Sequence, residues 1–241
     1  MRIIPYIIVL LISFSSCKKK DNSEPTLVPT NNNNNITTNY TYGSLATFYY
    51  QYYTGNIYTG SDSAVSAFFF TDPLNPSTTT VDAGTINYNG NPLVNTANVY
   101  KEYSLNVHQP NSVWAVSGNS VVPSINYTLT PNYPIFTGNA QLPDSFSISS
   151  GLTFTLTGIS NHPNSNVFVQ INDFTNSVYR NLGANQTVCS FSSAELAIFQ
   201  PNTYVYISLN LSNSVVQSFN GKDYAFSSSL NHMKSGVLVK P

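Results

Sequence analysis

The sequence predicts an all-β fold, and three observations carry that prediction. From about Gly43 onward, Asn, Gly, Pro and Ser turns recur at intervals of roughly 8 to 12 residues. Between the turns, apolar and polar residues alternate as they do in half-buried strands. Only one segment carries a helical start signal. We therefore expect tandem antiparallel β-sandwiches at residues 43–130 and 131–241, with one larger β-sandwich as the alternative.

The first group of strands opens with a segment that carries aromatics on both faces. In Leu45 to Tyr53, alternation places Ala46, Phe48, Tyr50 and Tyr52 on one face and Leu45, Thr47, Tyr49, Gln51 and Tyr53 on the other. Asn89-Gly90 fits a type I′ turn, because both central residues of that turn need positive φ. The remaining strands expected in this half are Val65 to Thr71, Thr85 to Tyr88, Pro92 to Val94, Val99 to Val107, Ser112 to Val116 and Ser124 to Leu129.

The second group contains the clearest half-buried strand. Gly151 to Gly158 alternates Leu152, Phe154 and Leu156 against three threonines, so the apolar set is predicted to be buried. A second Asn-Gly turn is predicted at Asn220-Gly221. The other strands expected in this half are Asn166 to Asn172, Ser177 to Leu182, Tyr204 to Leu211, Ser214 to Phe219, Lys222 to Ser228 and Val237 to Val239.

One short helix is predicted after Ser192. Ser192 with Glu195 three residues later satisfies the capping-box pattern, and Pro201 ends the helix. The helical turn leading into Tyr204 resembles the E–F corner of fibronectin type III and related immunoglobulin-like sandwiches. The resemblance implies that Tyr204 or Tyr206 bonds back to upstream backbone, and that the sandwiches are immunoglobulin-like.

The first twenty residues read as an export signal that ends at a cysteine. Arg2 is followed by an apolar stretch from Ile3 to Ile12, which is too short to span a bilayer, and small residues precede Cys17. We expect residues 1–16 to be a lipoprotein signal peptide and residues 17–42 to be the lipidated Cys17 and a flexible tether, rich in Asn and Pro. An ordinary secretory signal with an incidental cysteine is the alternative.

Phe14-Ser15-Ser16-Cys17 followed by three lysines and Asp21 resembles surface and envelope lipoproteins of the Bacteroidota. That resemblance implies cleavage before Cys17, lipid on its sulfur and an outer-membrane location, on the periplasmic or the cell-surface face. A looser likeness to such lipoproteins extends over most of residues 43 to 240, and it carries no activity.

Composition restricts the classes of partner. The chain has 9 Lys+Arg and 10 Asp+Glu, and charged residues make up 8% of it, far below the roughly 25% of an average soluble domain. This excludes an electrostatic footprint for nucleic acid. Asn, Ser, Thr and Tyr supply an uncharged surface that is rich in hydrogen-bonding groups.

No catalytic, metal or cofactor site is predicted. His108, His162 and His232 are isolated in sequence, and we expect them at the surface or in turns. Cys189 lies in an alternating segment and is expected to be a buried small hydrophobe. Asp144 and Asp173 are assigned to turns and Glu195 to the helix cap. A carboxylate pair of the glycosidase kind is not identifiable from the sequence.

Aromatics remain as candidate ligand groups. Tyr49, Tyr50, Tyr52 and Tyr53 supply flat rings with hydroxyl tips that can stack on sugars, whereas the simpler interpretation is that Tyr is a favoured strand residue. Asp62-Ser63-Ala64 resembles the three-residue O-glycosylation signal of Bacteroidota, which makes Ser63 a candidate modification site; an unmodified turn is the alternative.

The sequence thus favours a non-catalytic envelope protein, held to the membrane by its N-terminal lipid. Such a protein displays a binding or structural surface, and its partner is a glycan or another envelope protein. The alternative is a secreted-type hydrolase, glycosidase-like, that uses a carboxylate pair.

Overall fold

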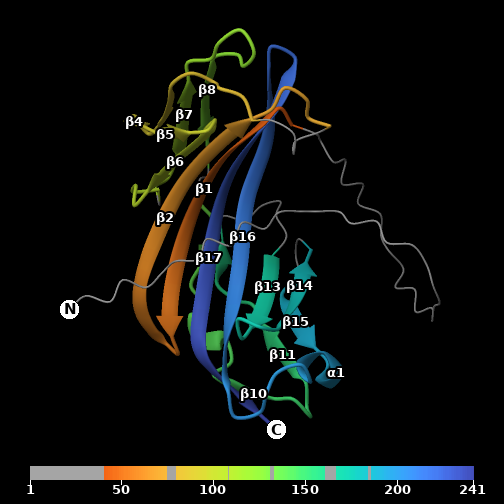
Figure 1. Cartoon of the computed structure of the whole chain (residues 1–241). Helices are drawn as coiled ribbons and strands as arrows, with labels where there is room; N and C mark the ends of the chain where they lie inside the picture. Colours follow the sequence, from red (N-terminus) through yellow and green to blue (C-terminus); the bar gives the residue numbers. More distant parts are fainter. Residues whose placement is uncertain (1–40, 75–79, 108, 131–132, 161–166, 184–185) are drawn as a thin grey trace, which may run out of the picture. The chain divides into compact units, whose positions relative to one another are not determined.

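The chain is almost entirely β, as predicted, in a computed structural model that describes residues 41–241 except 75–79, 108, 131–132, 161–166 and 184–185 (Figure 1). Two short helices accompany the strands, the 3₁₀ turn η1 (Asn139–Gln141) and α1 (Ser193–Leu196). The strands are β1 (Gly43–Thr54), β2 (Ile57–Phe69), β3 (Ile86–Tyr88), β4 (Asn91–Pro92), β5 (Val94–Thr96), β6 (Val99–Tyr103), β7 (Ser112–Val116), β8 (Ile125–Leu129), β9 (Ile135–Phe136), β10 (Ser145–Ser147), β11 (Leu152–Thr155), β12 (Ile159–Ser160), β13 (Val167–Asn172), β14 (Ser177–Leu182), β15 (Val188–Phe191), β16 (Tyr204–Phe219) and β17 (Lys222–Lys240).

A nine-stranded main sheet dominates the described residues. Its order is β14-β13-β16-β17-β1-β2-β6-β5, with β10 paired to β17 off this path. β1 runs parallel to β17 over its whole length, while the other pairs along the path are antiparallel. The four long strands β2, β1, β17 and β16 lie side by side in Figure 1.

The long strands differ from the sequence prediction. β16 is one strand of 16 residues where two were expected, and β17 is one strand of 19 residues. Asn210, Asn213 and Asn231 suggest turns when they are read alone, yet they lie within the ladder. The Asn210 Nδ2 amide donates to Asn231 Oδ1 across the two strands at 2.6 Å, so a cross-strand amide pair keeps these polar residues extended.

The predicted Asn-Gly turns are confirmed. Asn89 and Gly90 have φ of 47° and 81°, and they join β3 to β4. Asn220 and Gly221 have φ of 49° and 74°, and they join β16 to β17. Both residues of each pair sit in the left-handed region, as a type I′ turn requires.

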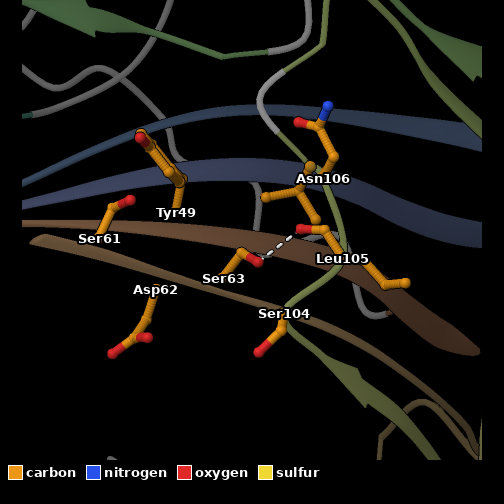
Figure 2. A pocket seen from close by; sticks show the side chains of 8 residues that line it. Tyr49, Ser61, Asp62, Ser63, Ser104, Leu105 and Asn106 are labelled. Atoms are coloured by element: carbon orange, nitrogen blue, oxygen red, sulfur yellow. Dashed lines mark hydrogen bonds between the residues drawn. The ribbon is translucent and has the colours of Figure 1, made fainter.

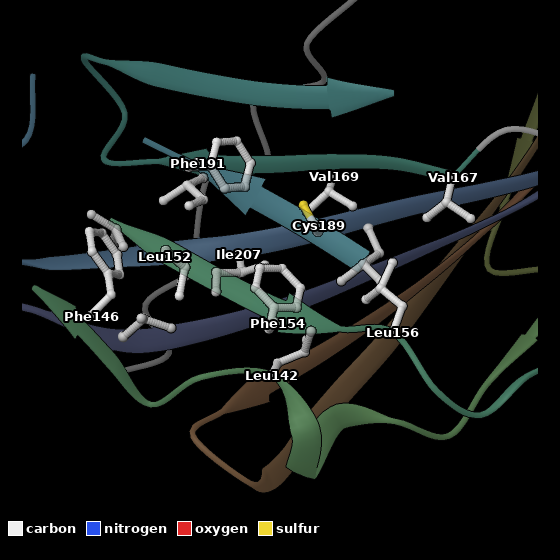
Figure 3. Packing of buried hydrophobic residues seen from close by; sticks show 14 of the residues in the cluster. Leu142, Phe146, Leu152, Phe154, Leu156, Val167, Val169, Cys189, Phe191 and Ile207 are labelled. Atoms are coloured by element: carbon white, nitrogen blue, oxygen red, sulfur yellow. The ribbon is translucent and has the colours of Figure 1, made fainter. Parts of the chain in front are cut away.

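Small sheets cover one face of the main sheet and form two cores with it. One core contains the four-stranded sheet β4-β3-β7-β8 and includes Trp114 and Tyr88, whose rings lie 5.0 Å apart. The other contains the pair β11-β15 and is shown in Figure 3. There Leu152, Phe154 and Leu156 are buried while Thr153, Thr155 and Thr157 are exposed, which confirms that strand's predicted orientation.

Among the described residues, strands from both predicted halves lie in the one main sheet. Residues Thr38–Pro241 form one compact unit. Tyr224 and Phe226, from the C-terminal half, pack in the core built mainly by the N-terminal half. Strands of 12 to 19 residues are long enough to pass both cores, so the two cores lie under one continuous sheet.

The predicted cap is confirmed and the predicted corner is not. Ser192 and Glu195 form a reciprocal capping box, and the Arg180 guanidinium donates to Glu195 at 2.6 Å. Tyr204, one of the two candidates for the corner tyrosine, is 67% exposed. The Tyr206 ring packs on Phe174, with ring centroids 5.1 Å apart.

Candidate functional site

Alternation along β1 divides the four candidate tyrosines between the two faces of the main sheet. Tyr49 points toward the cores and packs edge-on against Tyr133, with centroids 6.3 Å apart. Tyr53 packs on His232 at 4.7 Å. Tyr50 and Tyr52 lie on the opposite face, beside Asp62 and Gly60 of β2. The structure therefore does not bring the four rings together.

The face that carries Tyr50 and Tyr52 is here called the open face. Its other members lie at matching positions on the neighbouring strands, and apart from the small Ser229 they are all exposed or half-buried. Asp62 and Lys101 are the only charged residues in this set. The open face is defined by Phe48, Tyr50, Tyr52, Asp62, Ala64, Ser66, Lys101, Tyr103, Phe168, Gln170, Tyr179, Asn181, Ser208, Asn210, Ser212, Ser229, Asn231 and Met233.

Tyrosine hydroxyls and one carboxylate gather on the open face where β1, β2 and β6 meet. Tyr52 hydrogen-bonds to Asp62, and burial together with that carboxylate raises the pKa of Tyr52 to about 12. Burial and the neighbouring Tyr103 hydroxyl raise the pKa of Tyr50. Tyr50 and Tyr52 therefore stay neutral near pH 7 and can act as hydrogen-bond donors and acceptors beside the Asp62 side chain.

Two hollows adjoin this cluster. One, of about 490 Å³, is lined by Val94, Thr96, Val99, Lys101, Glu102 and Tyr103. The other, of about 430 Å³, lies between β2 and the segment that follows β6. It is lined by Tyr49, Ser61, Asp62, Ser63, Ser104, Leu105, Asn106 and Val107, all but the last of which are labelled in Figure 2. The first continues the open face, because Val99, Lys101 and Tyr103 share its side of β6.

Ser63 lies inside β2 and not in the turn that the sequence suggested. It is half-buried, and its Oγ donates to the Leu105 carbonyl at 2.5 Å (Figure 2). The Ser63 carbonyl also accepts the Ser104 amide at 3.0 Å. Attachment of a glycan would require the Oγ to give up its bond to Leu105. Modification of Ser63 stays a prediction, and Cys17 lies outside the described residues.

The largest correction concerns His232, which the sequence placed at the surface or in a turn. It is fully buried on the core side of β17, and its Nε2 lies 2.8 Å from Asn139 Oδ1. Burial, and next the charge of Lys234, lower the pKa of His232 to about 4, so the ring is neutral. His108 and His162 lie outside the described residues.

Lys234, two residues further on, is also fully buried. Its ammonium donates to the Leu142 carbonyl at 2.7 Å, to the Asn139 carbonyl at 3.3 Å and to Asn56 Oδ1 at 3.2 Å, and it pairs with Asp144 at 2.8 Å. These contacts tie the η1 segment and the β1–β2 turn to β17. Sequence reasoning missed this cluster, although His232 and Lys234 share the inward alternation of Phe226 and Leu230.

Every carboxyl side chain between residues 41 and 241 already has a partner. Glu195 caps α1, Asp173 accepts the amides of Thr175 and Asn176, and Asp144 pairs with Lys234. The remaining partners are Leu74 for Asp72, Tyr100 for Asp82, Tyr103 for Glu102, Ser218 for Asp223 and Tyr52 for Asp62. Among the described residues, no group of three or more His, Cys, Asp or Glu side chains is placed to hold a metal ion.

Comparisons with known proteins identify no family. Neither a protein-family model nor a curated protein matches the chain. A solved structure titled as a Ca²⁺-stabilized adhesin that helps an Antarctic bacterium reach out and bind ice is similar at 11% identity with a TM-score of 0.19. The similarity covers 81% of this chain and 49% of that structure. Within the described part of the chain, no helix is both long and apolar enough to cross a bilayer.

Proposed function

We propose that this protein is a lipid-anchored, non-catalytic envelope protein whose open face binds carbohydrate. One observation supports this most directly: a largely uncharged, partly exposed sheet face that combines Tyr50 and Tyr52 with Asn210 and Asn231. Sugars present apolar ring faces and many hydroxyls, so a matching surface needs flat aromatic rings beside neutral donors and acceptors. The open face supplies both.

The carboxylates favour binding over hydrolysis. A glycosidase needs two carboxyl groups roughly 5 to 10 Å apart across a bound sugar, with one of them in a setting that raises its pKa. Here the pKa values of Asp82, Asp173 and Glu195 are lowered by their hydrogen-bond donors. Asp62 is the carboxylate on the open face, where it serves as a hydrogen-bond partner of Tyr52.

Binding is tested with soluble protein that starts at Lys18, which lacks the signal and Cys17 but retains the whole compact unit. Retardation of the protein in native gels that contain neutral polysaccharides should be seen for the wild type and reduced for Tyr50→Ala and Tyr52→Ala. Tyr58→Ala removes a half-exposed tyrosine that contacts the inward Tyr53, and it should behave as the wild type. Wild-type mobility unchanged by every polysaccharide would refute the binding proposal.

Anchoring is tested separately in the native host. Metabolic labelling with a fatty-acid analogue should mark the wild type, and Cys17→Ala should abolish the label and release the protein from the membrane. Equal labelling of the two proteins would refute the lipoprotein assignment without affecting the carbohydrate proposal.

A further inference from the structure

A continuous row of side chains crosses six strands of the open face. Strand register aligns Asn181 of β14, Phe168 of β13, Asn210 of β16, Asn231 of β17, Tyr50 of β1 and Asp62 of β2. With neighbouring strands about 4.8 Å apart, the row is about 24 Å long. This is far longer than a single sugar, so the row offers several successive contact positions.

The row has aromatic groups toward both ends and amides in the middle. At one end the Phe168 ring is stacked with Tyr179, with centroids 5.4 Å apart and planes 27° apart. Toward the other end Tyr50 neighbours Tyr52 on the same face. Asn210 and Asn231 between them use one donor and one acceptor on each other, which leaves Asn210 Oδ1 and Asn231 Nδ2 for a ligand.

The sheet's twist further restricts the ligand. Adjacent strands rotate by roughly 20°, so the direction of the contact groups turns by roughly 100° over the five steps of the row. A flat crystalline surface meets only part of such a row at once. A single flexible chain follows the turn and contacts all of it.

From this arrangement we infer that the open face binds the interior of a single, soluble, uncharged polysaccharide chain that lies across the strands. The inference rests on the proposed function and specifies its ligand. Uncharged chains are favoured because the row contains no basic side chain and a single acidic one, Asp62, at one end. A chain end is not required, because the row lies on an open sheet face and is not a closed pocket.

The test uses the same soluble protein and a length ladder prepared from whichever neutral polysaccharide retards it, among soluble glucans, mannans, xylans and galactans. Calorimetry should show affinity that rises steadily from the disaccharide to the hexasaccharide. Phe168→Ala and Asn210→Ala, on strands distant from Tyr50, should each weaken hexasaccharide binding by about tenfold, equivalent to about 1.4 kcal/mol. Thr155→Ala, which is exposed on β11 and lies outside the open face, is the control. Insoluble crystalline cellulose and chitin should bind much less protein than the soluble chain.

Each other outcome has a defined meaning. If disaccharide and hexasaccharide bind equally, or if Phe168→Ala and Asn210→Ala bind as the wild type while Tyr50→Ala does not, the row is not the binding unit. The site is then local to β1 and β2, and the proposed function survives. Stronger binding to crystalline material than to soluble chains also overturns the inference. Failure to bind any neutral polysaccharide instead refutes the proposed function itself.

Discussion

The two faces of the main sheet place polar residues in opposite circumstances. On the core side, His232 and Lys234 are fully buried, and the Lys234 ammonium contacts four oxygens of the chain. On the open face, Asn210, Asn231 and Tyr50 are half-buried and keep atoms for other partners. On β17, the titratable side chains His232 and Lys234 are thus hidden in the core, whereas the neutral Asn231 is displayed. Residue type alone would suggest the reverse, and strand alternation decides the matter.

The largest expected effect comes from comparing the two faces of β11. Truncation of buried Phe154 to Ala removes a ring from a packed core and should cost roughly 3 to 5 kcal/mol. Thr155→Ala, on the exposed face of the same strand, should cost well under about 1 kcal/mol. Denaturant melts measure both. Equal losses would show that the two faces of β11 are not different environments.

A comparable loss is expected when the buried ammonium is removed. Lys234→Ala leaves the Leu142 and Asn139 carbonyls without their buried donor, which should cost about 3 kcal/mol. Asp144 is largely exposed, so water replaces its partner. Lys101→Ala, on the open face, should change the free energy of unfolding by under about 0.5 kcal/mol. If the two lysine variants were equally stable, the core-side cluster would be solvated and the contrast between faces would fail.

The neutral, buried His232 should make stability depend on pH. Its pKa is about 4 in the folded chain and about 6.5 when unfolded, so its contribution is present above pH 6.5 and is lost as pH falls toward 4. The total is about 3 kcal/mol, at 1.36 kcal/mol per pKa unit. His232→Gln keeps an amide toward Asn139 but does not titrate. The difference in stability between wild type and His232→Gln should change across this window, and a constant difference would contradict a buried neutral ring.

The smallest effect is expected on the open face at high pH. Tyr52, with its pKa raised to about 12, contributes stability that is present below pH 10 and is lost as pH rises through 12. Ultraviolet titration should show that Tyr52→Phe removes one phenolate that forms near pH 12. Asp62→Asn removes the carboxylate charge and should shift that step to lower pH. If the titration is unchanged in Asp62→Asn, Tyr52 does not interact with Asp62, which contradicts the hydrogen-bonded pair described on the open face.

Local patterns were sufficient for several parts of the fold. Strict alternation at Leu152, Phe154 and Leu156 identified their buried face, and Asn-Gly at 89–90 and 220–221 identified two turns. Alternation also divided Tyr50 and Tyr52 from Tyr49 and Tyr53, so half of the candidate site was predictable. The other half was not, because Phe168, Asn210 and Asn231 join Tyr50 only through pairing between distant strands.

The sequence by itself determined the all-β class, the α1 cap, the Asn-Gly turns and the inward set of β11, because these depend on neighbours only a few residues away. Tertiary structure alone decided that β1 lies parallel to β17, that both cores share one sheet, and that His232 and Lys234 are buried. These features depend on residues up to about 180 positions apart, such as Gln51 and His232. Which distant strands pair is chosen by the free energy of the whole assembled core, which no local window contains.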